Sequence, residues 1–253
     1  MSKILVATTM APYAALSPHP EASQNWLAGA EQLIDRTIRE GHTIEYLAML
    51  ETDARGEAPY RDVRARLRDL DVLSEIRYFS MVDMWDRVVT SNNRLWHICT
   101  GRNLIQQYAI KHDFDYILFV DADTSVPEDA VVKLLELDWP LTGGHVPTYV
   151  LDGPRIARIK DPHTGVEHDY RDIDVRLHMN TAGFLLVARD IFRRVWWRID
   201  PDEKMTDDPC YNFDAAQLGY ATLVRHDIEG RHFPESITPM EDRYSAQQRT
   251  VVQ

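Results

Sequence analysis

The segment Tyr116-Ile-Leu-Phe-Val-Asp-Ala-Asp123 joins an apolar run to two carboxylates. Its four consecutive apolar residues, rich in β-branched and aromatic types, predict a buried strand. Asp121 and Asp123 follow where this strand should reach solvent. Two neighbouring carboxylates repel each other unless a positive charge lies between them, and a divalent cation bound by only two carboxylates keeps coordination positions for phosphate oxygens. The segment therefore indicates either a cation site or, equally, a strand end with two solvated aspartates.

The composition is that of a soluble globular protein. The chain has 253 residues, 44% of them hydrophobic and 27% charged, which suits one large domain or two small ones. Its net charge of −12 argues against broad electrostatic attachment to nucleic acid or to an anionic membrane. We expect no membrane span and no secretory signal, because the sequence has no run of about 18 apolar residues and no signal-like start. Cys99 and Cys210 lack metal-type spacing, so we expect both to pack as small hydrophobes in a reducing cytoplasm.

Hydrophobic periodicity and turn residues predict alternating strands and helices. Gly41 occupies the position of a helix C-cap glycine, and the region from 140 to 174 is irregular, with a hairpin near 155–159. A strand, an acidic turn and then a helix is the layout of an α/β ligand crevice. We expect strands at 3–9, 43–49, 73–79, 116–120, 181–187 and 220–224, and helices at 23–40, 61–70, 103–111, 125–135, 191–196 and 206–219.

Several short motifs occur in the order found in one group of enzymes. They are Gly101-Arg102-Asn103 before a predicted helix, Asp121-Ala-Asp123, the strand Gly183–Val187, the pair Asp207-Asp208 eleven residues before Gly219, and His232 thirteen residues beyond Gly219. With these motifs, and with Asp121-Ala-Asp123 as a DxD motif, the chain resembles the GT-A-fold, nucleotide-sugar-dependent glycosyltransferases. In layout it is most similar to the small inverting, family 2-like group.

The resemblance covers the chain from Lys3 to about His232 and implies its architecture. We expect a single α/β domain over residues 1–235, with a mixed, mainly parallel sheet flanked by helices. The donor-binding half would span about 1–125 and the acceptor half about 126–235. Residues 236–253 would form a C-terminal tail.

The resemblance also implies a Mn²⁺ or Mg²⁺ ion and a catalytic base. Asp123 would bind the ion directly, and Asp121 would bind it through water or contact the donor ribose. His232 would be a third ligand, and imidazole suits Mn²⁺ better than Mg²⁺. Either Asp207 or Asp208 would be the base. The choice between them is open, because Asp207 stands where the group usually has Glu. The spacing favours Asp208.

The other candidate residues would contact the donor or the acceptor. Arg102 either binds the diphosphate or base of the donor or pairs with an acidic neighbour, and Gly143 and Gly144 either admit the sugar close to the backbone or are turn glycines. Trp196 and Trp197 are adjacent, so one should pack inside while the other faces an edge. The remaining donor-side candidates are Thr8, Thr9, Met10 and Ala122, and the acceptor-side candidates are Asn180 and Gly183.

The function implied by the resemblance is hexosyl or N-acetylhexosaminyl transfer, from a nucleotide-diphosphate sugar to an acceptor hydroxyl. UDP-linked donors are the default, and a single base favours inversion. A saccharide, a protein hydroxyl, a small metabolite or a modified nucleic-acid base would each serve as acceptor. A charged acceptor would be met by a basic patch of Arg155, Arg158, Lys160, His163, Arg171 and Arg176.

Two alternatives stand beside this hypothesis. The first is a sugar-nucleotidyltransferase-like enzyme, which shares an acidic metal pair but needs a Gly-rich, basic phosphate loop after the first strand. Residues 10–16 contain neither glycine nor lysine, so this alternative loses ground. The second is a non-catalytic, cation-dependent carbohydrate-binding protein, against which the intact set of acidic and imidazole side chains argues.

Overall fold

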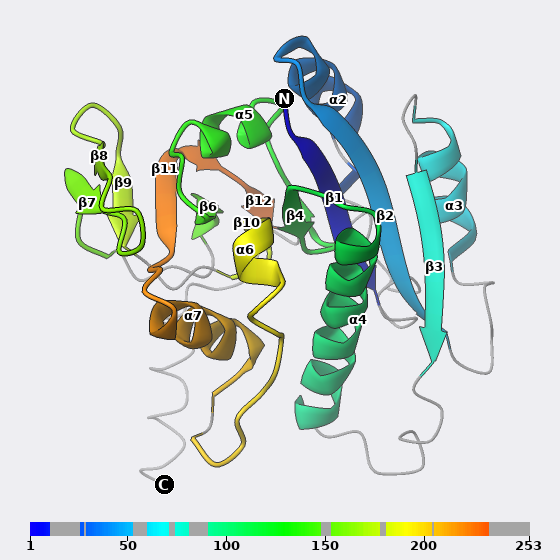
Figure 1. Cartoon of the computed structure of the whole chain (residues 1–253). Coiled ribbons are helices and arrows are strands. Elements are labelled where there is room, and N and C mark those ends of the chain that lie inside the picture. The colour runs from blue at the N-terminus through cyan, green and yellow to red at the C-terminus, as the bar shows by residue number, and fades with distance from the viewer. Residues whose placement is uncertain are drawn as a thin grey trace, which may run out of the picture.

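An eight-stranded mixed sheet forms the centre of the molecule (Figure 1). This computed structural model describes residues 1–10, 26–27, 29–52, 60–70, 74–80, 91–147, 153–177, 181–203 and 205–232. The sheet order is β3-β2-β1-β4-β10-β6-β11-β9, in which β9 and β10 run against the other six strands. The strands are β1 (Lys3–Met10), β2 (Thr43–Thr52), β3 (Ser74–Ser80), β4 (Tyr116–Val120), β6 (Leu141–His145), β9 (Val175–Leu177), β10 (Phe184–Ala188) and β11 (Leu223–Glu229).

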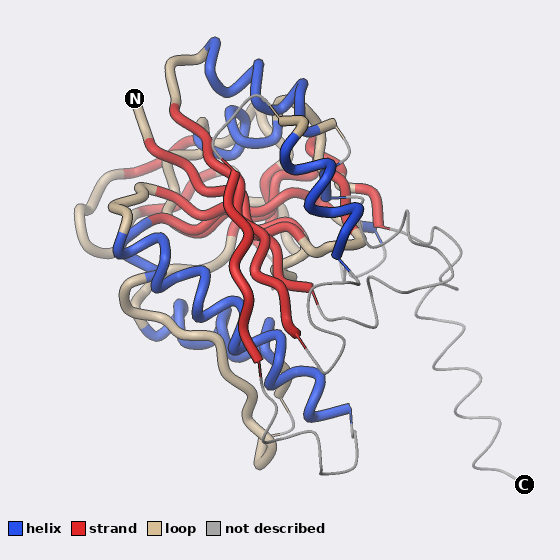
Figure 2. The backbone as a smooth tube through the Cα atoms, turned by 90° about the vertical axis from the view of Figure 1, so that its right-hand side faces the viewer, coloured by secondary structure: helices blue, strands red, loops and turns tan. Residues whose placement is uncertain are grey.

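Helices cover both faces of this sheet (Figure 2). They are α2 (Ala30–Arg39), α3 (Arg61–Arg68), α4 (Ser91–Lys111), α5 (Ala130–Leu135), α6 (Arg189–Phe192) and α7 (Asp207–Gln217). Alternate residues of β1 separate two cores, because successive side chains of a strand point to opposite faces. Leu5 packs in the core with α4, α6 and α7, and Ile4 packs in the core with α2, α3 and α5. The expected α/β architecture, a single domain with a mixed, mainly parallel sheet flanked by helices, is confirmed.

Two small sheets lie outside the central one. β5 (Thr124–Ser125) pairs antiparallel with β12 (Arg231–His232), and β7 (Arg158–Lys160) pairs antiparallel with β8 (Glu167–Asp169). The second pair is the hairpin expected in the irregular region, shifted a few residues toward the C-terminus. The first pair determines where the last described residues of the chain lie.

Two predictions near the acidic turn were wrong in their boundaries. Gly101-Arg102-Asn103 lies inside α4 and not before a helix, because α4 begins ten residues earlier. A Cβ at Gly101 would overlap Thr9, so glycine lets α4 approach β1 closely. The helix expected from Ser125 begins at Ala130, because the backbone of Ser125 pairs with Arg231 instead.

Other boundaries differ where glycine or a side chain redirects the backbone. The helix expected from residue 23 begins at Ala30, after Gly29 with φ of 72°; residues 23–25 and 28 lie outside the described residues. The helix expected over 191–196 ends at Phe192. The strand expected at 220–224 is β11, which begins at Leu223, because Gly219 has a φ of 93° and the indole of Trp139 donates to the Ala221 carbonyl at 2.8 Å.

Glycine in the central strand β6 has a packing reason. Gly143 and Gly144 are buried within this strand and are not turn glycines. A Cβ at Gly144 would overlap the ring of Phe184, a fully buried residue of β10. The two strands therefore use the missing side chain to seat an aromatic ring beside the sheet.

Gly144→Ala is expected to destabilise the fold by about 1–3 kcal/mol, because overpacking forces a buried ring to move. Chemical denaturation would measure this loss. Adding Phe184→Leu should recover part of it, since the smaller side chain vacates the space that the new methyl group needs. Equal stability of Gly144→Ala and the wild type would contradict this packing argument.

Candidate active site

The acidic turn lies at the carboxyl end of β4, beside the start of β10. Asp121 donates its backbone N–H to the Gly183 carbonyl at 3.4 Å. A Cβ at Gly183 would lie 3.2 Å from Oδ2 of Asp121 and 3.1 Å from Oγ1 of Thr181, so only glycine fits without adjustment. Because β10 is antiparallel, its first residues and not its last ones reach this edge of the sheet. Gly183, which the sequence analysis assigned to the acceptor side, therefore lies next to the acidic turn.

His232 lies beside Asp123, although 109 residues separate them in the chain. The pairing of β12 with β5 sets His232 opposite Thr124. The imidazole Nε2 lies 3.2 Å from Oδ2 of Asp123, and His232 is only 6% exposed. The sequence-based prediction that these two side chains share one place is confirmed as geometry; their binding of a metal stays a prediction.

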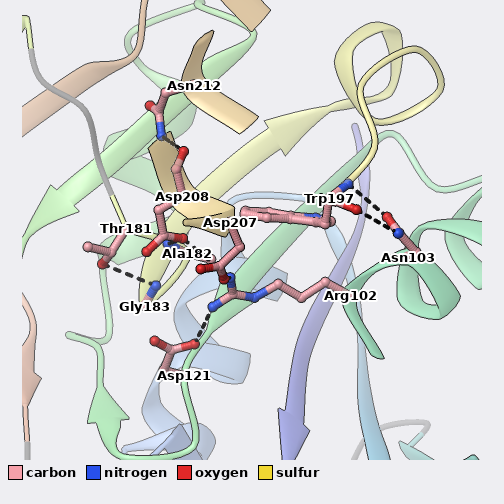
Figure 3. Close-up of polar contacts among 10 residues, drawn as sticks. All are labelled: Arg102, Asn103, Asp121, Thr181, Ala182, Gly183, Trp197, Asp207, Asp208 and Asn212. Atoms are coloured by element: carbon pink, nitrogen blue, oxygen red, sulfur yellow. Dashed lines mark hydrogen bonds and ion pairs between the residues drawn. The ribbon is translucent and has the colours of Figure 1, made fainter. Parts of the chain in front are cut away.

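One buried guanidinium joins the acidic turn to the acidic pair of α7 (Figure 3). Arg102 of α4 is 4% exposed, and its Nη2 donates to Oδ1 of Asp121 at 2.9 Å. Its Nη1 donates to Asp207 in a short ion pair and lies 3.3 Å from Oδ1 of Asp208. Of the two possibilities for Arg102, pairing with acidic neighbours is observed. A contact with the nucleotide-sugar donor stays a prediction.

Burial and neighbouring charges raise the pKa values of two of these carboxyl groups. Burial, the largest influence, acts with the charges of Asp207 and Asp121 against that of Arg102, and it raises the pKa of Asp208 to about 7. Burial likewise raises the pKa of Asp121, where the charge of Arg102 opposes the shift and Asp123 adds to it. The pKa of Arg102, which burial alone would lower, is raised by its three carboxylate partners. The site thus holds a permanent cation between two carboxyl groups, Asp121 and Asp208, whose pKa values are raised.

The two acids of α7 have different surroundings. The side chain of Asp207 is 7% exposed, whereas that of Asp208 is 25% exposed. Asp208 accepts a hydrogen bond from the Ala182 backbone N–H at 3.0 Å, which ties it to the chain just before β10. Asn212 donates to the backbone carbonyl of Asp208 at 2.7 Å and so holds the first turn of the helix. Asp208 is the more accessible carboxylate of the pair.

The sequence reasoning missed several contacts at this edge of the sheet. The Asn103 amide and the Trp197 backbone exchange two hydrogen bonds, and the Trp197 ring stacks on Tyr211. Glu51, which is 1% exposed at the end of β2, pairs with Nδ1 of His97 at 2.6 Å. Residue spacing does not predict such contacts, because they depend on how α4 packs. The available signal is that Asn103 and His97 are polar residues in a helix that packs on the core.

The expected donor-side residues lie at or near the same edge. Thr8 and Met10 are buried at the end of β1, and Ala122 packs at the border of the core within the acidic turn. Thr9 is half-buried there, beside Gly101 of α4. These positions agree with a crevice beyond the strand ends. Gly143 and Gly144 are part of the sheet interior, and Asn180 lies outside the described residues.

The possible metal-ligand atoms near the acidic turn form only part of a divalent-cation site. A carboxylate oxygen of Asp123 and an imidazole nitrogen of His232 converge, a combination that suits Mn²⁺. Within the part of the chain that the structure describes, no group of three or more His, Cys, Asp or Glu side chains is arranged to hold a metal. An ion here would therefore need further ligands from the substrate or from water, as the DxD pattern led us to expect.

The basic patch expected on the acceptor side is neutralised in the structure. Arg158 and Arg171 pair with Asp169 at 3.4 and 2.6 Å, and Arg176 pairs with Asp174 at 3.2 Å. Residues 153–177 contain five Lys or Arg and five Asp or Glu, so the region has no net charge. It therefore offers no general attraction to a polyanionic acceptor.

Other expectations about single residues hold. Trp197 is 2% and Trp196 39% exposed, so one packs inside and the other faces an edge, although both follow α6 and are not part of it. Cys99 and Cys210 are free and buried. Among the described helices, none has the length and apolar character needed to cross a membrane.

Comparisons with known proteins give distant similarities in structure only. No family model and no curated protein matches the sequence. Residues 1–349 of TarS from S. aureus match at 11% identity and a TM-score of 0.46, with 90% of this chain and 60% of that one covered, so the chain spans less than two thirds of it. A nucleoside-diphosphate-sugar pyrophosphorylase from Vibrio cholerae matches at 10% identity and a TM-score of 0.45 (88% and 91% covered). HddC from Yersinia pseudotuberculosis matches at 11% and 0.39 (99% and 100% covered). The function is therefore inferred from the site itself.

Proposed function

We propose that the protein is a metal-dependent glycosyltransferase. It moves a hexosyl or N-acetylhexosaminyl group from a nucleotide-diphosphate sugar, with UDP-linked donors first, to an acceptor hydroxyl. One observation supports this above the others: Arg102 holds a carboxylate with a pKa of about 7, that of Asp208, beside the acidic turn that ends β4. The proposed base and the acidic turn proposed to hold the cation thus contact the same guanidinium.

Asp208 is proposed as the base that removes the proton of the acceptor hydroxyl. A carboxylate with a pKa near the working pH is both available in the charged form and basic enough to take a proton. Its accessibility suits it for this role better than Asp207, which is buried against Arg102. With one base and no second carboxylate assigned as a nucleophile, direct displacement and inversion of the anomeric centre follow.

Asp123 and His232 are proposed to hold a Mn²⁺ or Mg²⁺ ion, with Asp121 beside them. When bound, such an ion would neutralise charge on the departing diphosphate. Asp121 is anchored by Arg102, so its carboxylate is held in place at the end of β4. Thr8, Thr9 and Met10 at the neighbouring end of β1 are proposed to border the nucleotide.

The acceptor is proposed to enter beside the first residues of β10. Ala182 and Gly183 lie there, between Asp208 and Asp121. Because the region 153–177 has no net charge, uncharged hydroxyl acceptors such as saccharides rank before phosphorylated ones. An acceptor screen with the best donor should therefore begin with neutral sugars.

Asp123→Ala is expected to abolish the metal-dependent binding of the donor. For the wild type, the right nucleotide-sugar at 100 times its Kd should stabilise the fold by about 2.7 kcal/mol when Mn²⁺ is present. The variant should lose this stabilisation, because a carboxylate ligand of the ion is gone. Thermal unfolding with a panel of nucleotide-sugars, with Mn²⁺ and with a chelator, measures the difference.

Asp129→Ala is the matched control, since Asp129 is a partly exposed aspartate a few residues beyond the same turn and pairs with Lys133 at 2.8 Å. It should keep the full response to donor and Mn²⁺. If no nucleotide-sugar stabilises the wild type with Mn²⁺, the proposed donor class is wrong. If the wild type responds and Asp123→Ala responds equally, the ion lies elsewhere.

A further inference from the structure

Trp197 lies beside Arg102 and next to Asp207 of the acidic pair (Figure 3). Its indole lies 4.6 Å from the guanidinium carbon of Arg102 on one contact and 3.9 Å from the ring of Tyr211, at 14°, on another. Phe119 of β4 meets it edge-on at 5.3 Å. These contacts fix the plane of the indole and, through it, the face of the guanidinium.

Asn103 fastens this tryptophan through its backbone. The Trp197 N–H donates to Oδ1 of Asn103 at 2.8 Å, and Nδ2 of Asn103 donates to the Trp197 carbonyl at 2.9 Å. The amide thus pairs with the backbone as a neighbouring strand would. Because Asn103 follows Arg102 directly in α4, the same turn of helix carries both the guanidinium and the anchor of the ring that it lies against.

Tryptophan at position 197 has an energetic cost, because its buried indole N–H lacks a hydrogen bond within the described part of the chain. Trp197 is buried, and its Nε1–H has no hydrogen-bond partner among the described atoms. A buried donor without a partner is unfavourable, and a phenyl ring would fill much of the space without it. The indole does offer the strongest cation–π attraction of the aromatic side chains. Because the ring lies against the Arg102 guanidinium, this attraction can offset the cost of the unpaired N–H.

We propose that Trp197, held by Asn103, is a positioning residue that orients Arg102 between the acidic turn and the base Asp208. This inference rests on the proposed function. With its face against the indole, the guanidinium directs its two edge nitrogens to Asp121 and to the α7 pair. Arg102 in turn links Asp121 of the acidic turn to Asp208 of α7. A tilt of the guanidinium would therefore displace the base from the acceptor hydroxyl.

Steady-state kinetics of Trp197 and Asn103 variants test the inference. Trp197→Leu should lower kcat roughly 10–100-fold at unchanged donor KM, because a misplacement of about 1 Å in the reacting groups has effects of this size. Trp197→Phe, which keeps an aromatic face, should lose roughly 3–10-fold. Asn103→Ala should fall between the two. Trp196→Leu, a change of the adjacent exposed residue, is the control and should keep the wild-type kcat.

A second measurement is independent of activity. The melting temperatures of Arg102→Met, Trp197→Leu and the double variant form a cycle, in which the double variant should lose less than the sum of the single losses. Wild-type kcat in folded Trp197→Leu, or strictly additive losses of melting temperature, would overturn the positioning role. If the wild type transfers no sugar at all, the proposed function fails, and the cycle still decides whether Trp197 acts through Arg102.

Discussion

Asp208→Asn is expected to lower the rate of sugar transfer about 10²–10⁴-fold, which is the usual contribution of a general base. Donor binding should persist, because the carboxylates of the acidic turn are untouched. The amide keeps the size of the side chain and still accepts from the Ala182 N–H. Transfer by the variant and by the wild type would be compared with the best donor and acceptor, and donor affinity would be measured in parallel.

Asp214→Asn provides a closely matched control. Asp214 also lies on α7, its side chain is 28% exposed beside 25% for Asp208, and it pairs with Arg198 at 2.8 Å. This variant should transfer at the wild-type rate. Turnover of Asp208→Asn within a few-fold of the wild type would assign the base to another group.

The same carboxylate predicts a pH profile. Because the pKa of Asp208 is raised to about 7, the base is protonated below that pH. The value of kcat/KM should rise tenfold per pH unit up to about pH 7 and then level off. Stability should change in the opposite sense: the unfolded chain loses this proton near pH 3.8, whereas the folded chain keeps it until about pH 7. The free energy of unfolding therefore falls as the pH rises between these values, and Asp208→Asn should remove that contribution.

Arg102→Met is expected to destabilise the protein by about 3–5 kcal/mol, the cost of leaving buried charges without their partner. Asp121, Asp207 and Asp208 would lose their common cation, and the uncompensated carboxylates would repel one another. Denaturation by urea would measure the loss. The variant should also lose transfer, because Asp121 and the acidic pair of α7 are no longer linked.

Arg189→Met is the control for this change. Arg189 also pairs with two aspartates, Asp113 and Asp115, but its side chain is 26% exposed beside 5% for Arg102. Its aspartate partners are well solvated, with Asp113 76% and Asp115 42% exposed, and its other hydrogen bonds go to the backbone carbonyls of Asp113 and Phe114. The loss should therefore be smaller than that of Arg102→Met. A smaller loss for Arg102→Met than for Arg189→Met would show that the buried cluster does not hold the site together.

The sequence was sufficient to predict the fold class and the meeting of distant residues at the site. Apolar runs that end in polar residues mark strands and the edge where they stop, which is why the turn after Val120 was found. The positions of Asp123 and His232 could be related only through the resemblance of the chain to a known group, since no local pattern links them. Their proximity in the structure comes from the pairing of β5 with β12.

Features that depend on packing between elements could not be predicted. Ser125-Val-Pro-Glu128 has the pattern of a capping box, which favours a helix start, but the backbone of Ser125 pairs with Arg231 instead. The glycines of β6 resembled turn residues, because a sequence does not reveal that Phe184 fills the space beside them. The grip of Asn103 on Trp197 likewise depends on where α4 lies against the chain after α6.

The reversed direction of β10 places the proposed acceptor side before the strand and not after it. Hydrogen bonds to β4 and β6 hold this strand from Phe184 onward, whereas the residues that introduce it stand next to Asp208 and Asp121. The backbone groups of Ala182 and Gly183 bind these two aspartates, so both residues should be kept. Directed evolution of acceptor preference should therefore begin at Thr181, which precedes the paired part of the strand.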